Sequence, residues 1–180
     1  MRVGARMKYL IGIILGVILT GGVILAYFLL GYAPAAVADH PMPFEKTIAN
    51  RSLAAHIARQ PTKDSPVPAD EADLVSGAYL YGMACAGCHG LPGKPKGDLA
   101  AGMYPPPPQF FAGNGGHGGP AIWETYWKVA NGVRLTGMPA FGGSMSETEL
   151  WQVSEVIAHK NALPDAAKAA LASPDAGSSK

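Results

Sequence analysis

Cysteine is scarce in this chain of 180 residues, which contains only Cys85 and Cys88. Two cysteines this close together cannot build a disulfide framework, so the fold does not depend on several crosslinks. Positive charge is also in short supply, because the formal net charge is +1. That balance excludes the broad basic surface that nucleic-acid binding usually requires.

Charged side chains are absent from residues 9–32, a run of 24 residues. As a helix rising about 1.5 Å per residue, this run would be roughly 36 Å long, enough to cross a hydrocarbon core of ~30 Å. Arg2, Arg6 and Lys8 precede it, which places residues 1–8 in the cytoplasm and the remainder outside. The sequence therefore predicts a single-pass anchor in a bacterial inner membrane, with the C-terminal part in the periplasm.

A cleaved signal peptide is the alternative interpretation of this N-terminal segment. Ala36, Val37 and Ala38 resemble a small-residue cleavage site. The apolar core of a signal peptide, however, is usually only ~7–15 residues long, so a retained anchor is preferred. Both interpretations deliver the rest of the chain to the same extracytoplasmic compartment.

The segment after the anchor, residues 33–69, is predicted to be a stalk or linker. Three prolines occur within 33–43, and a short helix is expected over 44–60 before a proline-containing stretch. At the other end of the chain, the Ala- and Ser-rich residues 164–180 are expected to form a flexible tail.

Helix signals mark out residues 70–163 as the folded domain. Asp70 is a good N-cap for a helix that runs into Cys85. A second helix is expected over 123–130, ending at the C-cap signal of Asn131 and Gly132. The last helix begins at a capping box formed by Ser146 and Glu149. The sequence thus predicts an all-α domain.

Residues 90–120 interrupt these helices with a long stretch dominated by glycine and proline, including four consecutive prolines at 105–108. Irregular segments of this length are uncommon in compact domains unless they serve a function. We therefore expect this segment to wrap around a bound cofactor.

The string Cys85-Ala86-Gly87-Cys88-His89 indicates what that cofactor is. C-x-x-C-H is the attachment signature of c-type haem. The two thiols can each add to one vinyl group of the porphyrin, and the next residue then presents an imidazole to the iron. We therefore expect one covalently attached haem c, with Cys85 and Cys88 as thioether residues and His89 as an axial iron ligand.

Three other interpretations of the two cysteines compete with haem attachment. A zinc site normally has four ligands, and no fourth ligand stands at zinc-like spacing. A thioredoxin-type redox pair would require alternating strands and helices, and that pattern is absent. A structural disulfide between the two cysteines is compatible with an oxidising compartment.

A sixth ligand for the iron is expected from Met138, which lies in the string Gly137-Met138-Pro139 on a loop between two predicted helices. A thioether is a soft ligand, and Met/His ligation raises the reduction potential of haem iron. Met103, Met145 and His117 are the alternative ligands, and packing against the ring is the alternative role of Met138.

These residues resemble the class I, single-haem c-type cytochromes over about residues 70–163. The resemblance rests on the Cys85–His89 motif followed by Gly90, and on the segment from Asn131-Gly132 to Met138-Pro139. It implies a small helical domain whose first and last helices cross at a glycine and aromatic contact. The residues matching that contact are Gly77, Tyr81 and Trp151.

The same resemblance implies further roles around the haem. A proline carbonyl, with Pro106 as the candidate, would accept a hydrogen bond from the ligating histidine. Trp127 and Arg134 are candidates for contact with the haem propionates, with core packing and solvent exposure as their respective alternatives.

The function expected from this resemblance is one-electron transfer by Fe(II)/Fe(III) cycling, without enzymatic chemistry or a small-molecule substrate. Redox protein partners would include a quinol-oxidising complex, a terminal oxidase or a periplasmic dehydrogenase. A haem c subunit of a larger membrane oxidoreductase or terminal oxidase complex is the alternative. Residues 70–163 carry eight acidic and five basic side chains, which disfavours any partner that needs a strongly positive cytochrome.

Overall fold

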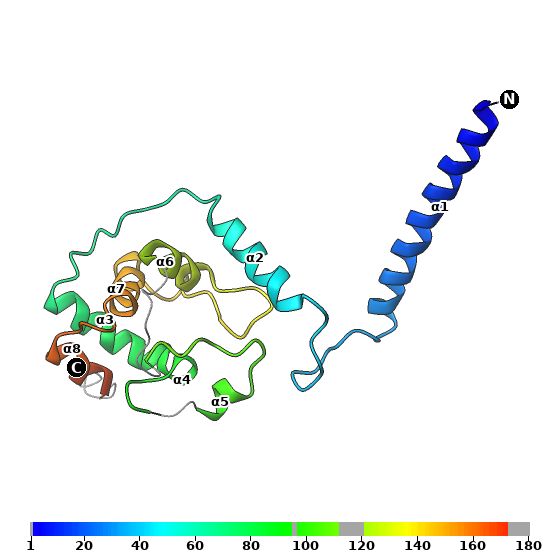
Figure 1. The fold of residues 1–180 in the computed structure, drawn as a ribbon. Helices are drawn as coiled ribbons and strands as arrows, with labels where there is room; N and C mark the ends of the chain where they lie inside the picture. Colours follow the sequence, from blue (N-terminus) through cyan, green and yellow to red (C-terminus); the bar gives the residue numbers. More distant parts are fainter. Residues whose placement is uncertain (1, 95–96, 112–120, 173–180) are drawn as a thin grey trace. The chain divides into compact units, whose positions relative to one another are not determined.

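The computed structural model describes residues 2–94, 97–111 and 121–172. Every regular element within these residues is a helix, and none of the described residues lies in a strand. The all-α expectation is therefore confirmed for this part of the chain. In chain order, the helices are α1 (Arg2–Leu29), α2 (Glu45–Ile57), α3 (Glu71–Ala84), α4 (Ala86–His89), α5 (Asp98–Ala101), α6 (Ile122–Asn131), α7 (Glu147–Ala158) and α8 (Asp165–Ala172) (Figure 1).

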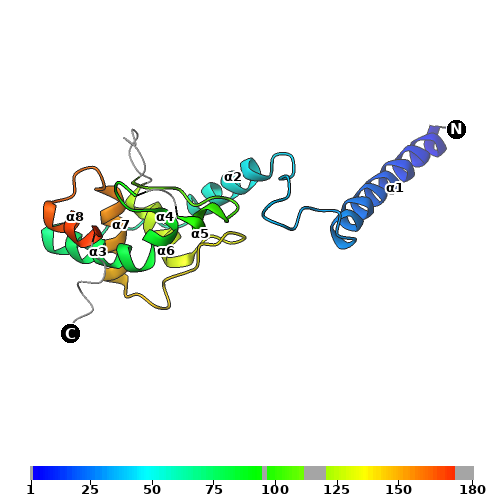
Figure 2. The same cartoon turned by 90° about the horizontal axis from the view of Figure 1, so that it is seen from below.

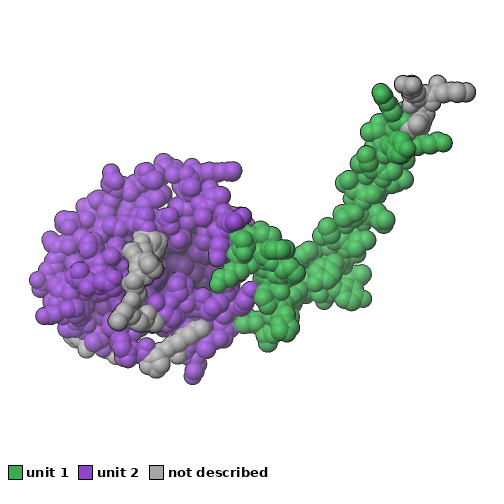
Figure 3. Space-filling model, in the orientation of Figure 1, with its two compact units in different colours: residues 1–48 green, residues 49–180 purple. Residues whose placement is uncertain are grey.

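The chain divides into two compact units, residues 1–48 and residues 49–180 (Figure 3). The first unit contains α1, which is long and apolar enough between Arg6 and Leu29 to cross a membrane. None of the side chains in this span is buried within the protein. Such a helix is the form expected of an anchor, although an N-terminal signal sequence has the same properties.

The second unit is built around α3 and α7. Helix α3 packs against both α7 and α8 (Figures 1 and 2). Helix α6 packs against α7. The side chains that are fully buried between these helices include Ala78, Tyr81, Val153, Val156 and Leu171. These long-range contacts bring the two ends of the domain together around one apolar core.

The two principal helices begin where the sequence predicts. The Asp70 side chain accepts a hydrogen bond of 3.0 Å from the backbone N–H of Asp73, which caps α3. Ser146 and Glu149 form the reciprocal capping box of α7. Capping satisfies backbone N–H groups that have no partner within their own helix. Both predicted N-termini are confirmed.

The crossing of α3 and α7 centres on Gly77. A Cβ atom on this residue would collide with the backbone carbonyl of Gln152 and would lie 2.9 Å from Cγ2 of Val156. The glycine half of the expected contact is therefore confirmed. The atoms nearest to Gly77 belong to Gln152 and Val156 on α7. Trp151 is buried in the same core as Tyr81, and its ring stacks on Tyr126 with 4.0 Å between the ring centroids.

Helix α8 corrects the prediction of a flexible tail over 164–180. Ala167 and Leu171 are fully buried against α3. These two residues are four positions apart and so lie on the same face of the helix. The sequence pattern did not indicate this apolar face because the segment is rich in alanine and only one of the buried side chains, Leu171, is large. Residues 173–180 lie outside the described residues.

The domain also begins earlier than the predicted boundary at residue 70, because its compact unit starts at residue 49. Ile57 on α2 is buried, and the neighbouring His56 ring makes an edge contact with Trp127 on α6, with 5.4 Å between centroids. Farther along, Lys63 lies 3.3 Å from the carboxylate of Glu147. Residues 49–69, which composition alone assigns to a stalk, are thus attached to the domain by apolar burial and this ion pair.

Replacing Gly77 by alanine should strongly destabilise the domain. The added methyl group collides with backbone, which cannot move aside as a flexible side chain can, so we expect a loss of about 2–3 kcal/mol in the free energy of unfolding. Gly143→Ala is the matched control, because a Cβ there meets no atom within 4 Å. Denaturant unfolding of the purified protein measures both, and equal stabilities would contradict the tight crossing.

Candidate functional site

The Cys-x-x-Cys-His motif occupies a single turn of helix directly after α3. The backbone N–H of Cys85 donates to the carbonyl of Tyr81, and the N–H groups of Cys88 and His89 both donate to the carbonyl of Cys85. Gly90 ends this turn with a φ of +79°, a left-handed conformation that glycine adopts readily. Helix α3 therefore fixes the start of the motif, and Gly90 redirects the chain immediately after the histidine.

Both cysteines are free thiols, Cys85 buried and Cys88 half-buried. Burial, with a smaller contribution from the neighbouring Cys88, raises the pKa of Cys85 to about 12. A thiol with so high a pKa differs from the low-pKa cysteines of thiol–disulfide enzymes. Within the described residues, no group of three or more Cys, His, Asp or Glu side chains is placed to hold a metal ion.

His89 is held in one orientation by the proline-rich segment. Its ring Nδ1 lies 2.9 Å from the carbonyl oxygen of Pro108, and because a carbonyl can only accept, Nδ1 carries the proton. The other ring nitrogen, Nε2, is then left with a lone pair that can bind a metal. The accepting residue is Pro108 rather than the expected Pro106.

The environment of His89 favours its neutral form. Burial lowers the pKa of the imidazole, and the hydrogen bond to Pro108 only partly offsets this effect. The ring of Phe110 stacks on the imidazole with 4.8 Å between centroids, while the N–H of Phe110 donates to the carbonyl of His89. A neutral, oriented imidazole is the form of histidine that ligates iron.

Gln109 joins the same segment to the motif, and sequence reasoning missed it. Its side-chain amide donates to the carbonyl oxygens of Cys88 at 2.8 Å and Pro107 at 3.1 Å. Gly90 leaves room for this side chain, since a Cβ there would lie only 2.7 Å from Oε1 of Gln109. A polar residue after four prolines gives no periodic signal, so only the folded chain reveals the contact.

Met138 lies on the loop that returns from α6 to α7, half-buried against the core. The loop leaves α6 at Gly132, where φ is +67° and an added Cβ would lie 2.7 Å from the backbone nitrogen of Ala140. The backbone N–H of Phe141 then donates to the carbonyl of Val129. The predicted loop position of Met138 between two helices is thus observed.

The alternative ligands occupy different places. Met103 lies beside the loop of Met138, with its sulfur 3.1 Å from the position that a Cβ on Gly137 would occupy. Met145 packs against the core just before α7. His117 lies outside the described residues.

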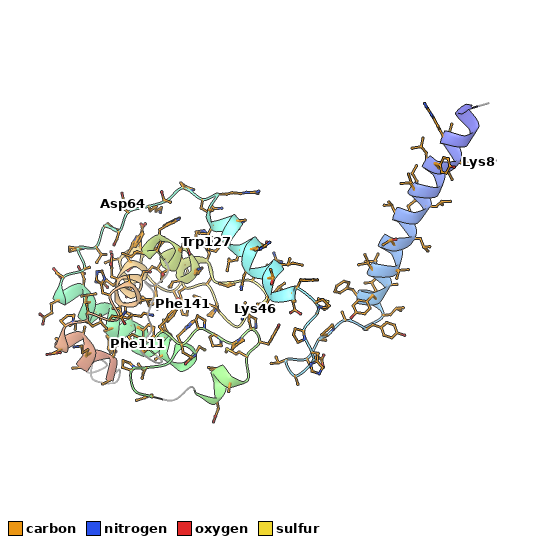
Figure 4. All side chains as sticks on the ribbon, viewed as in Figure 1. Lys8, Lys46, Asp64, Phe111, Trp127 and Phe141 are labelled. Atoms are coloured by element: carbon orange, nitrogen blue, oxygen red, sulfur yellow. The ribbon has the colours of Figure 1, made fainter. Side chains whose placement is uncertain are left out.

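The two candidates for propionate contact differ in burial. Trp127 is half-buried, and its backbone carbonyl accepts a hydrogen bond from the Asn131 side chain. Arg134 is exposed. Figure 4 marks Trp127, Phe111 and Phe141, aromatic side chains that come from three different segments of this unit.

The residues present fit a covalently bound porphyrin. Two thiols and an oriented imidazole share one helical turn, and half-buried apolar side chains such as Leu91, Phe110 and Phe141 line the core beside it. The buried indole N–H groups of Trp123 and Trp151 find no acceptor among the described residues, so the interior retains hydrogen-bonding capacity for a further group. The surface of the unit is also hollowed on the face drawn in Figure 3.

Comparison with known proteins agrees with this chemistry. Residues 72–155 match the family model described as "Cytochrome C oxidase, cbb3-type, subunit III". No curated protein and no solved structure matches the chain. The matched span includes the complete motif, Met138 and most of both helices that form the central crossing. Residues 72–155 therefore form a c-type cytochrome domain, which implies haem c and electron transfer.

Proposed function

We propose that this chain is a membrane-anchored carrier of single electrons with one haem c. Cys85 and Cys88 attach the haem through thioether bonds, and His89 and Met138 are the axial ligands of its iron. The observation that carries the proposal is the buried His89, whose Nδ1 is bound to the Pro108 carbonyl so that Nε2 is free for iron.

The bound haem would supply reversible one-electron chemistry at its iron. The contribution of the chain is to hold the two axial side chains in place, so that little has to reorganise when an electron arrives or leaves. Stacking of Phe110 and the Pro108 hydrogen bond fix His89, and burial excludes water from it. No acid, base or nucleophile is required, and we infer that the protein is not itself an enzyme.

The anchor sets where this carrier works. With Arg6 and Lys8 preceding the apolar helix, we propose that the N-terminus is cytoplasmic and the cytochrome domain periplasmic. Attachment to the membrane raises the effective concentration of the domain near membrane-bound redox partners. A quinol-oxidising complex, a terminal oxidase and a periplasmic dehydrogenase are the partner classes that fit.

A second candidate function is that of a haem c subunit within a terminal oxidase complex. The match of residues 72–155 to a subunit family of cbb3-type oxidases favours it. The chemistry at the haem is the same in both cases, and the difference lies in whether the partner is permanent or transient.

Covalent haem attachment is tested first by mass. Protein produced alongside a haem-ligation system should exceed its polypeptide mass by one haem and retain its colour on a denaturing gel. The double variant Cys85→Ala/Cys88→Ala should lose both properties, because no thioether bond can form. Met83→Ala is the matched control, an exposed residue just before the motif. A colourless wild-type protein of bare polypeptide mass would refute the proposal.

Met138→Ala should remove the sixth ligand. We expect the weak near-infrared charge-transfer band of His/Met-ligated ferric haem to disappear, the reduction potential to fall, and carbon monoxide to bind the reduced protein rapidly. Met103→Ala and Met145→Ala are the controls and should retain the band. Loss of the band in Met103→Ala, with its retention in Met138→Ala, would assign the ligand to Met103 instead.

The two candidate functions are separated by purification from native membranes in a mild detergent. A free carrier should elute as a monodisperse single-haem protein. An oxidase subunit should elute with other haem-containing chains at constant stoichiometry and lose them only when the detergent is made harsher. Constant co-elution would overturn the proposal of a free carrier in favour of the subunit.

A further inference from the structure

The loop that carries Met138 is closed by a threonine side chain. Oγ1 of Thr136 donates to the carbonyl of Val133 at 2.7 Å and accepts from the backbone N–H of Met138 at 3.1 Å. A third bond, 3.2 Å long, joins the N–H of Val133 to the carbonyl of Met138. One hydroxyl group therefore uses both its proton and a lone pair to connect the two ends of the loop.

The tip of this loop receives no support from packing. Leu135 is 92% exposed, and its φ of +60° is a left-handed conformation that costs a leucine energy. Strained residues persist only where surrounding contacts hold them. Among the described residues, the side chain that bonds across the loop is Thr136, so its hydroxyl opposes relaxation of the strained tip together with the backbone bond between Val133 and Met138.

The side of the loop next to Met138 is supported differently. The thioether of Met103 packs on Gly137, within 3.1 Å of the place where a Cβ would stand. This contact limits movement of the loop in one direction but makes no hydrogen bond. Movement of Met138 relative to Val133, just after the end of α6, must instead break the bonds of the Thr136 hydroxyl.

We propose that Thr136 is a positioning residue that holds Met138 in its ligating place and thereby keeps external ligands from the iron. The inference rests on the proposed function, because it requires Met138 to be the sixth ligand. Thr136 itself touches neither iron nor porphyrin in this proposal. It determines how often the loop opens, and therefore whether the protein behaves as a closed carrier or as an open, ligand-binding haem protein.

The test measures binding of imidazole to the ferric full-length protein in detergent. Thr136→Val keeps the shape of the side chain but removes the hydroxyl, leaving the Met138 N–H and Val133 carbonyl without this partner. Loss of two hydrogen bonds should tighten apparent imidazole binding by roughly tenfold. The near-infrared band of Met ligation should also be lost at a lower temperature than in the wild type.

Three further variants isolate the hydroxyl. Thr136→Ser retains it and should restore wild-type imidazole binding. Thr136→Ala removes the hydroxyl together with the γ-methyl group and should match Thr136→Val, so the test stands even if the valine variant incorporates no haem. Ser144→Ala is the matched control, since its hydroxyl also bonds a backbone carbonyl, that of Phe141 at 3.2 Å, but outside the ring closed by Thr136.

Imidazole affinities of Thr136→Val and Thr136→Ala within twofold of the wild type would overturn the inference. So would Thr136→Ser binding as tightly as Thr136→Val, because that result would assign the effect to packing of the methyl group. Failure of the underlying ligand assignment looks different: the near-infrared band would be absent from the wild type or retained in Met138→Ala, and Met138→Ala would bind imidazole no more tightly than the wild type.

Discussion

The hydrogen bond from His89 to the Pro108 carbonyl is the constraint on which the site depends. It is a contact between residues 19 positions apart, and it fixes the ring, its tautomer and the direction of its free nitrogen together. Three further contacts follow from the same approach of the chain: Gln109 to the Cys88 carbonyl, Phe110 to the His89 carbonyl, and the stacked rings of Phe110 and His89. The proline-rich segment thus holds the motif in place through these contacts.

The two halves of the site are stabilised by different physical means. On the motif side, prolines restrict the backbone before folding, so little entropy is lost when the segment docks. On the Met138 side, the loop has a strained leucine and a hydroxyl group that bonds across it. Gly132 allows close approach of the backbone of Ala140, and Gly137 leaves room for the Met103 side chain. His89 is therefore held by a stiff segment of chain, whereas the backbone of Met138 is held by hydrogen bonds within its own loop.

Local signals in the sequence predicted much of this structure correctly. Asp70 and the Ser146–Glu149 pair located the starts of α3 and α7, because capping depends on residues within a few positions of each other. The Cys-x-x-Cys-His motif likewise forms within one turn, and Gly132 ended α6 as expected. Ligation by Met138 and covalent attachment at the cysteines remain predictions.

Contacts between distant segments were the ones that sequence reasoning placed wrongly or missed. Four identical prolines offer four equivalent carbonyls, and only the path of the folded chain selects Pro108. The atoms nearest to Gly77 are set by the rotation of α7 about its axis, which brings the backbone of Gln152 and the side chain of Val156 to the crossing. Helix α8 was missed because its buried face consists of one leucine and small alanines, which hydrophobic periodicity detects poorly.

Attachment of residues 49–69 to the folded unit shortens the tether between membrane and haem domain. Only residues 30–44 connect the end of α1 to the start of α2, and a chain of that length spans at most about 50 Å when fully extended. A free linker reaching to residue 69 would span more than twice that distance. Under the proposed anchoring by α1, this linker length limits how far the cytochrome domain can reach from the bilayer surface.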